Sequence, residues 1–148
     1  MPDYARRFVL AVELGVTIFV LGLAQVSSAD LLIITREDTQ ISSVTPTEIS
    51  DLWLKKSDRI NSVRLTMMDI KEKTPERDAF YLDVVGMTDR QLKAYWAIQV
   101  FRGNGFPPEH LADKEAILEW LSSDKDRIGY ILGDSVAPPL KIVYRREY

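Results

Sequence analysis

The sequence contains no cysteine and a single histidine, His110, among its 148 residues. Without cysteine the chain has no disulfide framework, no thiolate metal site and no cysteine nucleophile. A single histidine in a loop after Pro107-Pro108 is typical of a solvated or capping side chain. The formal net charge is −3, so the chain lacks the basic excess of a nucleic-acid-binding domain. We therefore expect no nucleic-acid partner, no metal and no other cofactor.

The chain does have the composition of one globular domain. Hydrophobic residues make up 46% and aromatic residues 9% of it, which is more apolar content than disordered chains carry. At roughly 100–200 residues per domain, this length corresponds to one domain, alone or with a processing segment. No long linker, low-complexity tract or internal repeat divides the sequence.

Residues 1–29 have the pattern of a secretory signal peptide. Two arginines precede an uncharged apolar run at residues 14–24, and small residues lead up to Ala29. The alternative is an uncleaved membrane anchor, but Glu13 interrupts the apolar stretch, and a spanning helix needs about 20 predominantly apolar residues. We expect cleavage after Ala29 and export to the periplasm of one domain, residues 30–148. Contact with the membrane is expected only if the segment is retained.

The rest of the chain alternates predicted strands and helices. Strands are expected at residues 31–35, 63–67, 128–132 and 140–144, and helices are expected to start at Thr45, Thr74, Thr88 and Asp113. Each helix start has a side-chain oxygen that can cap the free backbone amides of the first turn. Strands interleaved with helices predict an α/β fold, with a small mixed or parallel sheet flanked by about four helices.

The motifs that come closest to catalysis are better explained as turns. Gly133-Asp134-Ser135 follows a predicted strand, as a nucleophile elbow does, but an elbow needs a helix directly after the serine. Pro138-Pro139 is incompatible with that helix. Gly103-Asn104-Gly105 follows a helix rather than a strand, which is typical of a helix stop and not of a phosphate loop. We therefore expect that the protein is not an enzyme.

Four aromatic residues lie in and just after the third predicted helix: Tyr95, Trp96, Phe101 and Phe106. They could form a stacking platform for a ligand. Tyr95 and Trp96 are adjacent, so we do not expect them to share one helical face, and at least one of them should lie in the core. We interpret the four residues as packing residues.

The junction before the helix at Thr74 is where backbone chemistry favours a ligand. Unpaired N–H groups and the positive end of the helix dipole attract anions, and Lys71 and Lys73 add positive charge. The alternative is plain capping, because every helix needs a cap and Glu76 already places a negative charge in the first turn. Thr74, Arg77, Lys71 and Lys73 are the candidate anion ligands.

Four segments of the chain match the pattern of a known family. They are Leu52-Trp53-Leu54-Lys55-Lys56, Arg77-Asp78-Ala79-Phe80, the stretch from Gln91-Leu92-Lys93-Ala94-Tyr95-Trp96 to Pro107-Pro108, and Ile128-Gly129-Tyr130-Ile131. Over about residues 31–132 the sequence resembles the short phosphate ABC transporter substrate-binding-like proteins, relatives of the type 2 periplasmic binding protein fold. The resemblance implies a single lobe of that fold, a non-enzymatic role, and binding of phosphate or another small oxyanion linked to ABC-type uptake.

The sequence departs from this family at the junction itself. In phosphate-binding relatives the segment that matches Thr74–Glu76 reads Ser-Gly-Thr, and an arginine stands where this chain has Ile70. Here Pro75 lacks an N–H donor, and Glu76 brings a carboxylate to the place of the anion. One lobe also leaves the site incomplete, so a second copy or another envelope protein would complete it. The alternative function is a ligand-free accessory or sensory interaction protein of the cell envelope.

Overall fold

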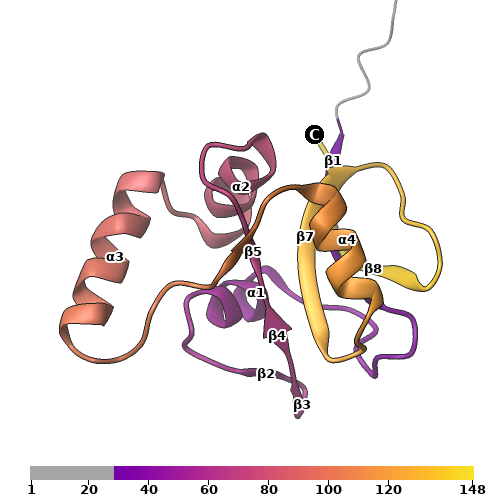
Figure 1. The fold of residues 1–148 in the computed structure, drawn as a ribbon, viewed down its shortest axis with the longest axis horizontal. Coiled ribbons are helices and arrows are strands. Elements are labelled where there is room, and N and C mark those ends of the chain that lie inside the picture. Colours follow the sequence, from indigo (N-terminus) through magenta and orange to yellow (C-terminus); the bar gives the residue numbers. More distant parts are fainter. Residues whose placement is uncertain (1–28) are drawn as a thin grey trace, which may run out of the picture.

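A four-stranded sheet lies at the centre of the part of the chain that the computed structural model describes, residues 29–148 (Figure 1). Its strands are β1 Asp30–Arg36, β4 Thr66–Met67, β7 Arg127–Gly133 and β8 Leu140–Arg146. They are arranged in the order β4-β7-β1-β8. Strand β1 pairs antiparallel with β7 and β8, whereas β4 pairs parallel with β7. The sheet is therefore mixed, which is one of the two arrangements, mixed or parallel, that the sequence predicted.

The predicted signal peptide lies outside the described residues, apart from Ala29. Cleavage and export therefore stay predictions. Within residues 29–148, no helix combines the length and the apolar character needed to cross a membrane.

Two small two-stranded sheets lie beside the central one. They are formed by β2 Arg59–Ile60 with β3 Val63–Arg64, antiparallel, and by β5 Asp69–Ile70 with β6 His110–Leu111, parallel. The prediction of one strand over residues 63–67 is wrong, because the chain changes partner at the buried Leu65, from β2 to β7. Asn61 and Ser62 form the β2–β3 turn with φ values of 48° and 76°. This hairpin has no glycine, and glycine is the usual sequence signal for such a turn.

The four helix starts lie where the capping residues predict them. The helices are α1 Pro46–Trp53, α2 Pro75–Phe80, α3 Asp89–Phe101 and α4 Lys114–Ser122, and a π-helix, Tyr81–Val85, continues α2. Thr45 and Thr88 each form a complete capping box, with Glu48 and Gln91 respectively. The π-helix was not predicted, and it ends at Gly86 with φ 75°.

The helices cover the sheet on both faces. All five residues of the predicted first strand, 31–35, are buried in β1, as expected for a strand covered on both sides. Successive residues of β7 point to opposite faces. Gly129 lies under Ile117 and Leu121 of α4. Tyr130 stacks on Phe80 of α2, with ring centroids 4.0 Å apart and an interplanar angle of 1°. Helix α4 therefore covers one face and α2 the other.

Helix α3 lies to one side of these layers (Figure 1). Among its 13 residues, Leu92 and Trp96 are the buried ones. The hydroxyl of Tyr95 donates a hydrogen bond to the carbonyl oxygen of Leu54 at 2.8 Å, which fastens the helix to the end of α1. The rest of α3 is largely exposed.

We expect Gly129→Ala to destabilise the fold, because the added Cβ would lie 3.2 Å from side-chain carbons of Ile117 and Leu121. Both side chains are fully buried. Overpacking of this kind lowers the free energy of unfolding by about 1–3 kcal/mol, which urea denaturation would measure. Gly133→Ala in the same strand is the control, since its nearest neighbour would lie at 3.6 Å. Equal losses at both positions would contradict the packing explanation.

Candidate functional site

Thr74 is the N-cap of α2, as predicted. Its hydroxyl oxygen accepts a hydrogen bond from the backbone N–H of Arg77 at 3.4 Å and donates one to the carbonyl oxygen of Lys71 at 3.0 Å. Pro75 follows at the start of the helix and has no N–H to offer. The hydroxyl group of Thr74 is therefore already engaged within the junction.

Arg77 is buried rather than directed into solvent, with 11% of its side chain exposed. Its Nε donates a hydrogen bond to Oδ2 of Asp69 at 3.2 Å. Its Nη1 lies 3.6 Å from Oδ1 of Asp89, and the guanidinium carbon lies 4.8 Å from the centre of the Tyr81 ring. Burial is the largest influence and lowers the pKa of Arg77, but the charge of Asp69, the neighbouring Tyr81 and Tyr130 and the hydrogen bond to Asp69 together outweigh it, so the net pKa is raised. Arg77 is a charged group that is already paired inside the fold.

Asp69 is the acceptor at the centre of this arrangement, with 6% of its side chain exposed. Its Oδ2 also accepts a hydrogen bond from the Tyr81 hydroxyl at 2.8 Å, and its Oδ1 accepts one from the Tyr130 hydroxyl. Burial, followed by the charge of Asp69, raises the pKa of both tyrosines. We call Asp69, Arg77, Tyr81 and Tyr130 the buried carboxylate cluster. Its hydrogen bonds satisfy a carboxylate that would otherwise be costly to bury.

A cavity of about 350 Å³ lies beside this cluster. Its charged lining consists of the carboxylates of Asp69, Glu72 and Glu109 and the guanidinium of Arg77, and His110 also lines it. Three carboxylates outnumber one guanidinium. Two like charges about 4 Å apart repel by about 4 kcal/mol near a protein surface. The cavity is therefore unfavourable for a phosphate dianion.

The structure separates the four predicted anion ligands. Arg77 lines the cavity, whereas Lys71, Lys73 and Thr74 do not. Both lysines are exposed, and neither forms an ion pair within residues 29–148. Lys73 has a left-handed backbone, with φ 65°. Lys71, Lys73 and Thr74 thus form an outer group at the junction that does not include Arg77. In the described part of the chain, no three His, Asp or Glu side chains are grouped to hold a metal ion.

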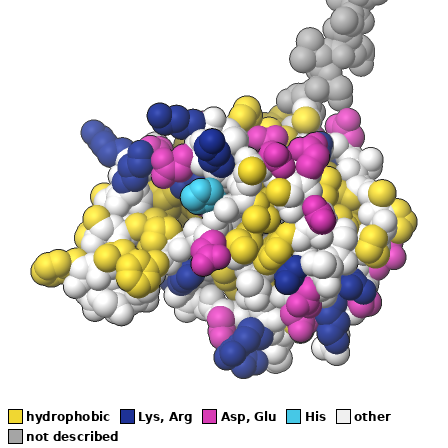
Figure 2. Space-filling view, viewed as in Figure 1, with side chains coloured by type: hydrophobic (Ala, Val, Ile, Leu, Met, Phe, Trp, Pro, Cys, Tyr) yellow, Lys and Arg dark blue, Asp and Glu magenta, His cyan; other side chains and the backbone are white. Residues whose placement is uncertain are grey.

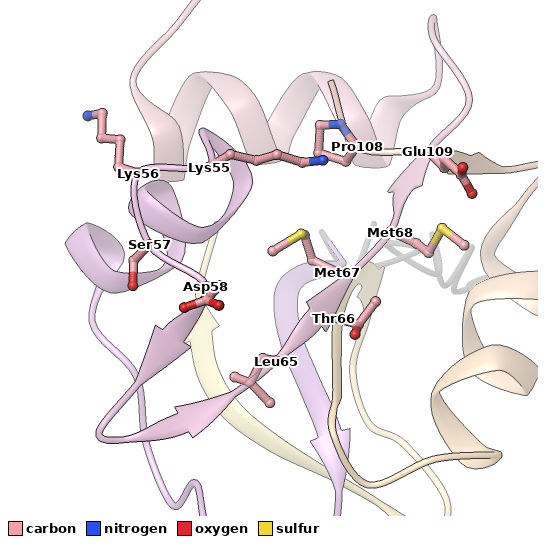
Figure 3. A pocket seen from close by; sticks show the side chains of 10 residues that line it. All are labelled: Lys55, Lys56, Ser57, Asp58, Leu65, Thr66, Met67, Met68, Pro108 and Glu109. Atoms are coloured by element: carbon pink, nitrogen blue, oxygen red, sulfur yellow. The ribbon is translucent and has the colours of Figure 1, made fainter. Parts of the chain in front are cut away.

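A larger cavity of about 760 Å³, which the sequence did not predict, lies between the end of α1 and β4 (Figure 3). Leu65, Met67, Met68 and Pro108 give it an apolar lining, and Lys55, Lys56, Ser57, Asp58, Thr66 and Glu109 complete it. The side chain of Lys55 extends toward Pro108. Lys55 has a left-handed backbone, with φ 53°.

The prediction that the four aromatic residues near α3 serve packing is wrong for two of them. Phe101 is 93% exposed and Phe106 is 69% exposed. Trp96 is buried and Tyr95 is half-buried, and their rings meet edge to face with centroids 5.1 Å apart. The two neighbours thus share the covered side of α3, contrary to expectation, because the long side chain of each reaches back toward the body of the fold.

Comparison with known proteins finds similarity in fold but no significant similarity in sequence. No protein-family model matches the chain, and no curated protein matches its sequence significantly. Among solved structures, a phosphate ABC transporter substrate-binding protein from Clostridium perfringens with bound phosphate superposes on 78% of this chain, with a TM-score of 0.59 and 18% identity. An ABC-type phosphate transport receptor from Vibrio cholerae superposes on the same share, with a TM-score of 0.59 and 12% identity. PstS from Borrelia burgdorferi superposes on 71% of the chain, with a TM-score of 0.50 and 14% identity.

These alignments cover 42–46% of the solved proteins, so the chain spans less than half of their length. Its mixed α/β architecture with four α-helices matches a single lobe of the phosphate-binding type of periplasmic binding protein. The fold class expected from the sequence is therefore confirmed. At this level of identity the likeness concerns the fold.

We expect Asp69→Asn to lower the free energy of unfolding by about 3–5 kcal/mol, because it leaves the buried Arg77 without its counter-charge. Asp89→Asn is the matched control. It removes the other carboxylate near Arg77, but the Asp89 side chain is 53% exposed, and exposed pairs contribute about 0–1 kcal/mol. Chemical denaturation of both variants measures the difference. If both variants lost a similar amount of unfolding free energy, the burial of Asp69 would not explain its contribution to stability.

Stability should also fall as the pH rises above about 10, the pKa of a tyrosine in an unfolded chain. Above that pH the unfolded chain loses its tyrosine protons, whereas the raised pKa values of Tyr81 and Tyr130 keep their protons in the folded state. Each of the two tyrosines then lowers the free energy of unfolding by up to about 1.4 kcal/mol per pH unit. Urea denaturation at pH values from about 9 to about 11 should show a shallower decline for Tyr81→Phe than for the unchanged chain. If the stability of Tyr81→Phe and of the unchanged chain declined equally with pH, the raised pKa of Tyr81 would not be the cause.

Proposed function

We propose that the chain is an exported, non-enzymatic lobe of the solute-binding fold that acts through protein–protein interaction in the cell envelope. The observation that carries this proposal is the buried carboxylate cluster. The one arginine among the predicted anion ligands is already paired with Asp69 at 3.2 Å and is shielded from solvent.

An anion captured by Arg77 would either displace Asp69 or bind beside it on the other N–H groups of the guanidinium. Displacement leaves the Asp69 carboxylate buried without its charged partner, which costs about 3–5 kcal/mol. Binding beside Asp69 brings two negative charges together, and like charges about 4 Å apart repel by about 4 kcal/mol near a protein surface. The incoming anion would also meet Glu72 and Glu109, which line the same cavity. The Asp69 carboxylate therefore occupies the position beside Arg77 that a free anion would need.

The single-lobe architecture supports an interaction role. The chain spans 42–46% of its solved structural relatives, which corresponds to about one lobe of their fold. One lobe presents a single wall of any cleft that two lobes would enclose. That wall is open to another protein surface, whether or not a solute lies in the cleft.

Oxyanion binding linked to ABC-type uptake is the second candidate. One solved protein of similar fold holds phosphate, and Lys71 and Lys73 flank the Thr74 cap on the exposed side of the junction. An anion bound there would contact Lys71, Lys73 and the junction at Thr74. It would not use Arg77, which lines the cavity that these three residues do not reach.

Isothermal titration of the chain with phosphate, and separately with sulfate, distinguishes the two functions. We expect no binding heat at concentrations up to about 1 mM, the range in which a solute receptor would saturate. Sub-millimolar phosphate binding that disappears in Thr74→Ala would overturn the interaction role in favour of the outer anion site.

The double variant Pro75→Gly, Glu76→Thr sharpens this test. It restores an N–H at the start of α2 and removes the carboxylate of its first turn. If the junction is a lapsed anion site, phosphate affinity should rise by about tenfold or more, equivalent to about 1.4 kcal/mol. No gain in affinity would mean that Thr74 serves as a helix cap and nothing more.

A further inference from the structure

Helix α3 carries apolar residues on two opposite sides, and the body of the fold covers one of them. The covered side presents Leu92, Tyr95 and Trp96. The other side presents Ala94, Ala97, Ile98 and Phe101, which follow the i, i+3, i+4, i+7 spacing of a helical stripe. At about 100° per residue, the two sides lie roughly 160° apart. We call these four residues the outer stripe.

The outer stripe is exposed and carries no charge. Ile98 is 49% exposed, Phe101 is 93% exposed, and both alanines are exposed. Hydrophobic side chains gather over α3 at the left of Figure 2. A helix that is apolar on opposite sides is normally buried on both, and an exposed apolar surface marks a site of interaction.

We infer that the outer stripe binds the outer stripe of a second copy of this chain, with the two α3 helices antiparallel. This inference deepens the proposed interaction role, on which it rests, by naming the surface and the partner.

The shape of the stripe favours a second copy in this orientation. The stripe begins with a small residue, Ala94, and ends with a large one, Phe101. An antiparallel two-fold arrangement places each Phe101 over the alanine of the other copy, and the small Ala97 residues at the centre allow a close approach. A two-fold contact of this kind uses the same surface on both partners.

The helix dipoles are compatible with the same arrangement. Antiparallel helices place the positive end of one dipole beside the negative end of the other. Lys93, which flanks the stripe, is held by Asp89 on its own helix at 2.8 Å.

The area of the stripe sets the expected strength of the contact. A buried aromatic side chain contributes about 150–250 Å², so the two Phe101 side chains supply roughly 300–500 Å². Ile98 and the alanines add to this, but the total stays near or below the roughly 1,200 Å² at which stable interfaces begin. The dimer should therefore be reversible and should dissociate at micromolar concentrations.

Sedimentation of the chain, as recovered from the cells that express it, tests the dimer over a concentration series. We expect a monomer–dimer equilibrium for the unchanged chain, and a monomer throughout for Ile98→Asp. Val100→Asp is the matched control, because Val100 is 42% exposed on the same helix but lies off the stripe. It should dimerise as the unchanged chain does, and circular dichroism checks that both variants are folded. A chain that stays monomeric, or equal loss of dimer in both variants, would overturn the inference.

Single cysteines test the orientation, because the chain has none of its own. In the antiparallel pair the two copies of residue 97 lie about 1.5 Å apart along the axis, and the two copies of residue 94 lie about 10 Å apart. Only the first pair comes within the roughly 7 Å that a disulfide spans. Ala97→Cys should therefore form a disulfide-linked dimer under mild oxidation, and Ala94→Cys should not. Linkage at both positions would indicate parallel helices and would overturn the proposed orientation.

Two further results would refute the second copy as the occupant. If the A97C variant is monomeric and its thiol reacts slowly with a maleimide, another segment of the same chain covers the stripe. If the thiol reacts rapidly and the chain is monomeric, nothing covers it. These failures are separate from failure of the proposed function, because phosphate binding would overturn the interaction role whatever the oligomeric state.

Discussion

The carboxylate of Asp69 holds together parts of the chain that have little else in common. It lies on β5, a strand of two residues, and it accepts hydrogen bonds from Arg77 on α2, Tyr81 on the π-helix and Tyr130 on β7. A buried charge costs several kcal/mol unless such donors stay in place. The cluster thereby fixes α2 against β7, and the stacked rings of Phe80 and Tyr130 fill the space beside it.

The same interaction determines what the site can do. Because Arg77 is already paired with Asp69, the lobe does not offer an unpaired buried guanidinium to an anion. The cavity beside it has an acidic lining, and the exposed lysines of the junction lie apart from it. The uncovered side of α3 also stays open to other molecules.

Much of this fold could be predicted from local sequence. The capping residues located the four helix starts, and the apolar run at residues 31–35 indicated a strand buried on both faces. The break at Leu65 was not predictable, because strands β3 and β4 differ only in which distant segment they pair with. The exposure of Phe101 was missed for a related reason: aromatic character predicts burial but does not say what covers the side chain.

The sequence by itself determined where helices begin, which strands are apolar throughout, and that strands alternate with helices. These properties depend on residues within a turn or two of each other. Only the tertiary structure decided that Arg77 is buried, that Asp69 is its partner, and that one side of α3 is left uncovered. Asp69 and Tyr130 are 61 residues apart in the chain. Such contacts are fixed by packing between remote segments, and no local pattern of residues records them.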